Sequence, residues 1–93
     1  MSKVSVVLAA YRGEKYIADQ LWSLFAQTYP PDEILIGDDS PDDATETAVR
    51  GMLHRAPSHC RVDYWRNGVQ LGVDRNFEAL MRKASGDLIF ICD

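Results

Sequence analysis

Two adjacent acids, Asp38 and Asp39, directly follow the apolar run Ile34-Leu35-Ile36. Three consecutive apolar residues are typical of a strand that is buried on both faces. Such a strand has no structural need for two carboxylates at its carboxyl end, where like charges repel each other. In open parallel sheets, ligands bind outside that end of the strands. The pattern therefore predicts a ligand site, with Asp39, the acid further from the strand, facing the ligand.

Polar residues also follow two other apolar runs. Tyr11 and Arg12 come directly after residues 4–10, and Asp93 comes directly after the last apolar run. Parallel strands end at the same edge of a sheet, so these side chains should lie near Asp39. Three separate strand ends that carry polar groups to one edge indicate a ligand site at that edge.

Along the chain, segments with the apolar pattern of a strand alternate with segments in which apolar residues recur with the period of a helix. Strand patterns cover residues 4–10, 33–38, 60–65 and 88–92. Helical stripes of apolar residues cover residues 14–27, 41–55 and 73–84. Strands that alternate with helices predict βαβ units, and therefore an α/β fold with a mostly parallel sheet.

We expect the spatial strand order 3-2-1-4, counted along the chain. The third strand alternates apolar and polar residues, which favours an edge position, whereas the very apolar fourth strand should be central. The helix after Asp39 should begin at Pro41, with Ser40 as its N-cap. Asp38 should hold this loop through backbone N–H groups, and Asn76 should cap the third helix or hold the loop before it.

Length and composition bound the class of protein. Ninety-three residues make at most one small domain, and 46% hydrophobic with 26% charged residues is typical of a globular protein. A formal net charge of −4 argues against a general nucleic-acid-binding protein, which would carry a basic surface. The sequence has no apolar run of about 18 residues, as a transmembrane helix requires, and Cys60 and Cys92 lack metal or disulfide spacing. We therefore expect a cytoplasmic protein.

Several short blocks occur in an order that is more specific than any one of them. They are residues 4–11, 14–17, 23–30 and 32–40, followed by Asn67, 72–73, 76–78, 86–88 and Asp93. In this order they resemble the family 2 glycosyltransferases of the GT-A fold, and residues 72–78 look most like bacterial rhamnosyltransferase-type members. The resemblance covers nearly the whole chain and implies the Rossmann-like, three-layer α/β/α half of a GT-A domain.

The resemblance implies an enzyme that transfers a sugar from a nucleotide diphosphate donor to a glycan or lipid-linked acceptor, in polysaccharide or cell-surface glycan synthesis. Asp39 would accept a hydrogen bond from the base, for example from the N3–H of a pyrimidine. UDP and dTDP share that N–H, so both donors stay open. The donor-site residues that the resemblance implies are Ala10, Tyr11, Glu14, Asp39, Arg75 and Asp93.

The chain departs from the family pattern at two places. The family usually has Asn after the tyrosine, where this chain has Arg12, which either helps to hold a diphosphate or is solvated. The Asp-x-Asp motif, whose second acid would ligate Mg²⁺ or Mn²⁺, begins at Asp93. We therefore expect residues 1–93 to be the amino-terminal, nucleotide-sugar-binding part of a longer enzyme, truncated at the start of that motif and inactive alone. No residue among them is assigned as a metal ligand or catalytic base, and association of the longer enzyme with the cytoplasmic face of a membrane stays open.

Two other interpretations are weighed against this one. A phospho-receiver module also uses paired acids at strand ends to bind Mg²⁺, but its pair follows the first strand, which here ends in Ala9-Ala10-Tyr11. Alternatively, residues 88–92 form an exposed hydrophobic edge, and the chain is an inactive piece that self-associates through it.

Overall fold

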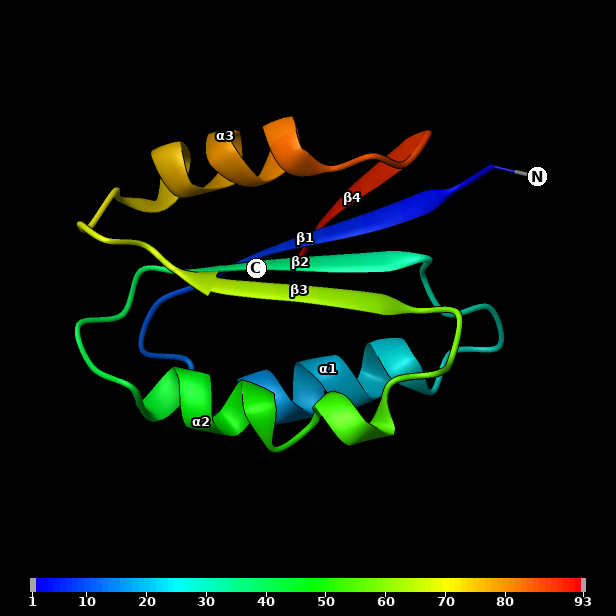
Figure 1. Cartoon of the computed structure of the whole chain (residues 1–93), viewed down its shortest axis with the longest axis horizontal. Helices are drawn as coiled ribbons and strands as arrows, with labels where there is room; N and C mark the ends of the chain where they lie inside the picture. The colour runs from blue at the N-terminus through cyan, green and yellow to red at the C-terminus, as the bar shows by residue number, and fades with distance from the viewer. Residues whose placement is uncertain (1, 93) are drawn as a thin grey trace.

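The computed structural model describes residues 2–92 as a four-stranded sheet covered by helices. All strand pairs are parallel, and their order is β3-β2-β1-β4, as the sequence predicts. The helices α1 and α2 cover one face of the sheet and α3 covers the other, so the fold has three layers (Figure 1). The elements are β1 (Val4–Ala10), α1 (Ile17–Phe25), β2 (Glu33–Asp38), α2 (Ala44–Arg50), η1 (Leu53–Arg55), β3 (Arg61–Arg66), α3 (Val73–Lys83) and β4 (Leu88–Cys92).

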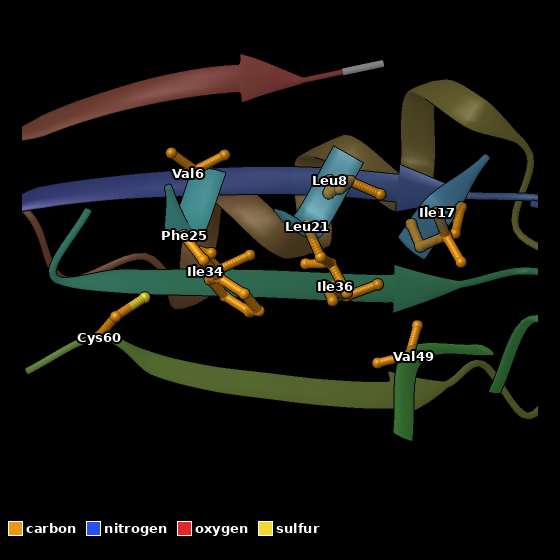
Figure 2. Packing of buried hydrophobic residues seen from close by; sticks show 10 residues of the cluster. Val6, Leu8, Ile17, Leu21, Phe25, Ile34, Ile36, Val49 and Cys60 are labelled. Atoms are coloured by element: carbon orange, nitrogen blue, oxygen red, sulfur yellow. The ribbon is translucent and has the colours of Figure 1, made fainter. Parts of the chain in front are cut away.

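The two middle strands, β1 and β2, carry most of the core. Every residue of β2 is buried, because it pairs with β1 on one side and β3 on the other. Successive side chains of a strand point to opposite faces. Ile34 and Ile36 accordingly pack with residues of α1 and α2, as Figure 2 shows, whereas Leu35 packs with Leu80 of α3. The continuous apolar run is therefore explained by a strand with a helix layer on each side.

The start of α2 differs from the prediction. The helix begins at Ala44 rather than Pro41, and its N-cap residue is Asp43, whose side chain makes no capping hydrogen bond. Ser40 is instead buried, and its hydroxyl accepts a hydrogen bond from the backbone N–H of Arg12 at 2.7 Å. The hydroxyl also lies 3.1 Å from Thr45 Oγ1. Because tertiary contacts use the hydroxyl, the capping pattern at Ser40 does not produce a helix start.

The strand β4 lies beside β1, as the predicted order requires, but the expectation of a central strand is wrong. We expected this very apolar strand to be central, but in the described sheet it pairs with β1 alone and forms an edge. Leu88, Ile89, Phe90 and Ile91 keep between 38% and 57% of their surface exposed. An apolar strand is expected to be covered by other parts of the protein. Among residues 2–92, no layer covers these four side chains, so the apolar composition of β4 does not make it central.

A buried acid connects three segments at the amino end of the sheet. Glu33 has no exposed surface, and its carboxylate accepts hydrogen bonds from Ser5 Oγ at 2.6 Å and from the Ser85 N–H at 2.7 Å. Arg61 forms an ion pair with it at 2.6 Å. Burial raises the pKa of Glu33, but the hydrogen bonds from Ser5 and Ser85 outweigh burial, so the pKa lies below its ordinary value. The acid therefore remains ionised at neutral pH and holds the start of β4 to β1 and β2.

Candidate functional site

A cavity of about 230 Å³ lies at the carboxyl ends of β1 and β2, beside the start of α3. This is the edge of the sheet at which the sequence predicts a site. Three of the predicted site residues, Ala10, Tyr11 and Asp39, line the cavity. The full lining is Ala9, Ala10, Tyr11, Asp39, Gln70, Gly72, Val73 and Asn76.

Asp39 holds the loop between β3 and α3. One carboxylate oxygen accepts hydrogen bonds from Asn67 Nδ2 at 2.9 Å and from the Leu71 N–H at 2.8 Å, and the other accepts the Gly72 N–H at 2.9 Å. The residue is only 7% exposed. Burial raises the pKa of Asp39, but the hydrogen bonds from Leu71, Asn67 and Gly72 outweigh burial and keep the pKa below its ordinary value. Asp39 is therefore an ionised group on the cavity wall.

The backbone of Gly72 makes this arrangement possible. Gly72 precedes α3 and has φ = 85°, a conformation that residues with a Cβ rarely adopt. The turn directs the N–H groups of Leu71 and Gly72 toward Asp39 at the start of α3. A carboxylate is favourable there, because the unpaired N–H groups at a helix N-terminus carry a partial positive charge.

Asn76 holds α3 and the loop against the sheet. Its Nδ2 donates to the carbonyl of Gly37 at 2.8 Å, and its Oδ1 accepts from Asn67 Nδ2 at 3.2 Å. The prediction that Asn76 holds the preceding loop is thus confirmed. A Cβ on Gly37 would lie only 2.4 Å from Asn76 Oδ1, so this contact requires glycine in β2.

Asp38 has a structural position, as predicted. It is fully buried, and its carboxylate accepts the backbone N–H of Ser40 at 2.9 Å and the hydroxyl of Tyr64. Burial, followed by the hydrogen bond to Asp38, raises the pKa of Tyr64. Both oxygens of Asp38 therefore bind protein donors, and the two neighbouring acids differ in that only Asp39 lines the cavity.

The remaining predicted residues lie elsewhere. Glu14 is exposed in the turn before α1 and is not part of the cavity lining. Arg75 is exposed on α3 and lines a different hollow, together with Leu71. Asp93 lies outside the described residues.

The sequence did not single out Gln70 and Val73, which both line the cavity. Their sequence signals are the turn-rich segment 67–72, which contains Gln70, and the resemblance block 72–73, which contains Val73. This pattern marks a loop without indicating which of its side chains face inward.

Residues 2–92 contain no group of three or more His, Cys, Asp or Glu side chains arranged to hold a metal ion. The same part of the chain has no helix with the length and apolar character that crossing a bilayer requires.

A parallel sheet with a cavity at its strand tips is the arrangement of α/β proteins that bind ligands at the carboxyl edge. The model of glycosyl transferase family 2 matches residues 5–93, so the chain belongs to this family. An uncharacterized glycosyltransferase of Nostoc sp. (strain PCC 7120) is 28% identical over 91 residues, which are 98% of this chain and 27% of that protein. The chain thus spans about a quarter of the length of this relative.

Solved structures of glycosyltransferases share the fold. A mannosyltransferase of Pyrobaculum calidifontis, in complex with GDP-Man and Mn²⁺, matches with a TM-score of 0.83 and 23% identity over 95% of this chain and 26% of its own. TarS of S. aureus, in complex with UDP, matches with a TM-score of 0.79 and 26% identity over 98% of this chain and 27% of its own. The GT-A-type fold is thereby confirmed, and the receiver-like alternative is not supported.

Proposed function

We propose that the cavity beside Asp39 binds the nucleotide of a sugar donor, and that residues 1–93 form the donor-binding part of a longer glycosyltransferase. The observation that carries the proposal is an ionised, partly accessible carboxylate in a cavity at the strand tips of a family 2 chain. The structural relatives in complex with GDP-Man or UDP support a nucleotide-sugar donor.

The hydrogen bonds of Asp39 favour a base with a single N–H on its pairing edge. An ionised carboxylate has about four acceptor positions. Asn67, Leu71 and Gly72 use three of them, two on one oxygen and one on the other. One position remains, which suits the lone N3–H of uracil or thymine, whereas guanine presents two adjacent donors. We therefore propose a UDP- or dTDP-sugar as the donor.

The size of the cavity suits the base of the nucleotide rather than the whole donor. Pockets that enclose a whole drug-sized ligand measure about 300–1,000 Å³. A cavity of about 230 Å³ is smaller, so it suits the base, while the ribose, diphosphate and sugar extend beyond it. Ala10 and Gly72 leave room for the base, and the exposed ring of Tyr11 lies at the mouth of the cavity as a surface for stacking.

We propose that the remaining parts of the reaction belong to segments outside residues 2–92. A divalent cation, Mg²⁺ or Mn²⁺, would be held by acids that begin at Asp93, where it would neutralise diphosphate charge. The catalytic base is assigned to no residue of this chain. The acceptor is a glycan or a lipid-linked glycan of the cell surface, and the longer enzyme works in the cytoplasm or on the cytoplasmic face of the membrane.

Titration calorimetry with nucleosides tests the base contact without altering the protein. Uridine should bind this chain at least about tenfold more tightly than 3-methyluridine, which lacks the N3–H, because a hydrogen bond to a charged group contributes about 1.5–3 kcal/mol. Cytidine should resemble 3-methyluridine, because its N3 is an acceptor. Equal affinities for uridine and 3-methyluridine, or tighter binding of guanosine than of uridine, would exclude the role proposed for Asp39.

We also propose that this chain self-associates, with β4 of one copy pairing with β4 of a second copy. The apolar side chains of β4 are exposed on an edge whose backbone pairs with β1 alone, and such edges template pairing with another strand. Light scattering should show a species heavier than the 10.5 kDa chain, with a share that grows with concentration. A monomer at all concentrations would contradict this proposal and leave the nucleotide site unaffected.

A further inference from the structure

Arg12 has an unusual backbone conformation at the edge of the cavity. It lies in the turn directly after β1 with φ = 51°, and among residues 2–92 no other non-glycine residue has a positive φ. The left-handed region is costly for residues other than Gly, Asn and Asp. A strained backbone conformation persists only where surrounding contacts hold it, and residues in such conformations occur more often at functional sites than elsewhere. Arg12 therefore requires an explanation beyond surface solubility.

Two contacts hold Arg12 in this conformation. Its backbone N–H donates to Ser40 Oγ at 2.7 Å, directly beside the cavity residue Asp39. The next residue, Gly13, donates its N–H to Thr45 Oγ1 at 2.9 Å. The turn is thus attached to the segment between β2 and α2, which fixes where the side chain of Arg12 emerges.

The guanidinium group lies over another cavity residue. Arg12 Nε donates to Tyr11 Oη at 3.2 Å, and the guanidinium carbon is 5.5 Å from the centre of the Tyr11 ring. Tyr11 lines the cavity, so the positive charge of Arg12 lies against a cavity residue, although Arg12 itself is not part of the lining. Both side chains are exposed.

The charge of Arg12 is not neutralised by an ion pair. Other arginines form ion pairs with carboxylates, including Arg61 with Glu33 and Arg82 with Glu78. Within the described part of the chain, no carboxylate oxygen lies within 4.0 Å of the Arg12 guanidinium. The carboxylates of Asp42 and Glu14 act on the guanidinium only at longer range, and Arg12 is exposed, so its remaining N–H donors can bind an anion from solution. A guanidinium matches the oxygens of a phosphate group in pairs.

We propose that Arg12 binds the diphosphate of the donor whose base lies in the cavity beside Asp39. This inference rests on the proposed function and assigns the charged part of the same ligand. In this arrangement Tyr11 contacts the base or the ribose. The guanidinium over the Tyr11 ring contacts the phosphates, which extend out of the cavity.

The test compares ligands that differ only in their phosphates. Calorimetry in EDTA removes divalent cations, so that phosphate affinity reports on protein groups alone. Wild-type chain should bind UDP more tightly than uridine, and Arg12→Gln should lower the UDP affinity about fivefold to tenfold without changing the uridine affinity. Arg12→Lys should retain most of the UDP affinity, and added salt should weaken UDP binding more in wild type than in Arg12→Gln.

Arg55→Gln is a matched control. Its guanidinium lies 5.7 Å from the ring centre of Trp22, an arrangement like that of Arg12 on Tyr11 but away from the cavity. This variant should leave both affinities unchanged.

The outcomes separate the two proposals. If Arg12→Gln weakens uridine and UDP equally, or weakens neither, the phosphate contact of Arg12 is wrong while the nucleoside site stands. If wild type binds neither ligand, the proposed function fails and the inference on Arg12 fails with it.

Discussion

Replacing Asp39 by asparagine tests whether its charge holds the loop between β3 and α3. In the wild-type chain the two oxygens accept three donors, from Asn67, Leu71 and Gly72. Asparagine has one acceptor oxygen and one NH₂ group, so at least one of these donors would face another donor. The variant therefore changes the hydrogen bonding with almost no change in side-chain volume.

The expected loss of stability follows from those hydrogen bonds. A buried N–H left without an acceptor costs about 1–3 kcal/mol, and the bonds that remain lose the strength that a charged acceptor adds. We expect Asp39→Asn to lower the free energy of unfolding by about 2–3 kcal/mol. In a domain of this size, that corresponds to a decrease in Tm of roughly 10–20 °C.

Urea unfolding followed by circular dichroism measures this loss, and its pH dependence identifies the cause. The pKa of Asp39 is lowered in the folded chain, so its stabilisation is complete above the unfolded pKa of about 3.9. It is lost as the pH falls through the folded value. The difference in stability between wild type and variant should therefore narrow as the pH is lowered from 5 to 2.

Asp43→Asn is the control for this experiment. Asp43 is exposed and its side chain makes no capping hydrogen bond, so the same substitution should change stability by no more than about 0.5 kcal/mol. If Asp39→Asn unfolds at the wild-type urea concentration, or if the difference stays the same from pH 5 to pH 2, the carboxylate does not hold the loop.

Three other substitutions test separate parts of the structure. Gly37→Ala should destabilise the chain by about 1–3 kcal/mol through the clash with Asn76, whereas Gly51→Ala, whose nearest atom would be 3.5 Å away, should be neutral or stabilising in urea unfolding. Glu33→Gln should lower stability by about 1–3 kcal/mol at pH 7 and by less near pH 3, because the lowered pKa of Glu33 makes its contribution fall with pH; a pH-independent loss would contradict this. Phe90→Lys should raise the monomer fraction in light scattering, because a charge on an edge strand opposes pairing, and an unchanged mass would exclude β4 as the interface.

The sheet could be predicted because each strand has a clear hydrophobic pattern, either a continuous apolar run or an alternation of apolar and polar residues. Ile34, Leu35 and Ile36 are apolar on both faces, and both faces are covered by helices. The mixed pattern of β3 correctly places it at an edge. The predicted order also correctly places β4 beside β1. The expectation that β4 is central failed, because an apolar strand indicates burial without indicating what covers the strand.

The site could be predicted in position but not in its hydrogen bonds. Asp39 lies on the cavity wall as expected from its place after β2. Its partners could not be foreseen, because they depend on the path of the loop and on the positive φ of Gly72. The loop conformation also decides that Gln70 faces the cavity, whereas Arg75 lies on a face of α3 that lines a different hollow, together with Glu78 and Arg82. Ser40 shows the same limit, because a distant backbone group, the N–H of Arg12, binds the hydroxyl that a local pattern assigns to a helix cap.

The bonds around Glu33 have a consequence for how β4 opens. Its entry is held firmly, since Ser85 donates twice to Glu33, Gly86 donates to Ser5, and Leu88 donates to the carbonyl of Lys3. Toward Cys92 the strand has β1 as its sole pairing neighbour in the described sheet. Because successive N–H groups of a strand alternate sides, only those on the same side as the Leu88 N–H face β1. Among these, amide deuterium uptake should be slowest at Leu88 and faster toward Cys92, so that β4 separates from β1 first at its carboxyl end.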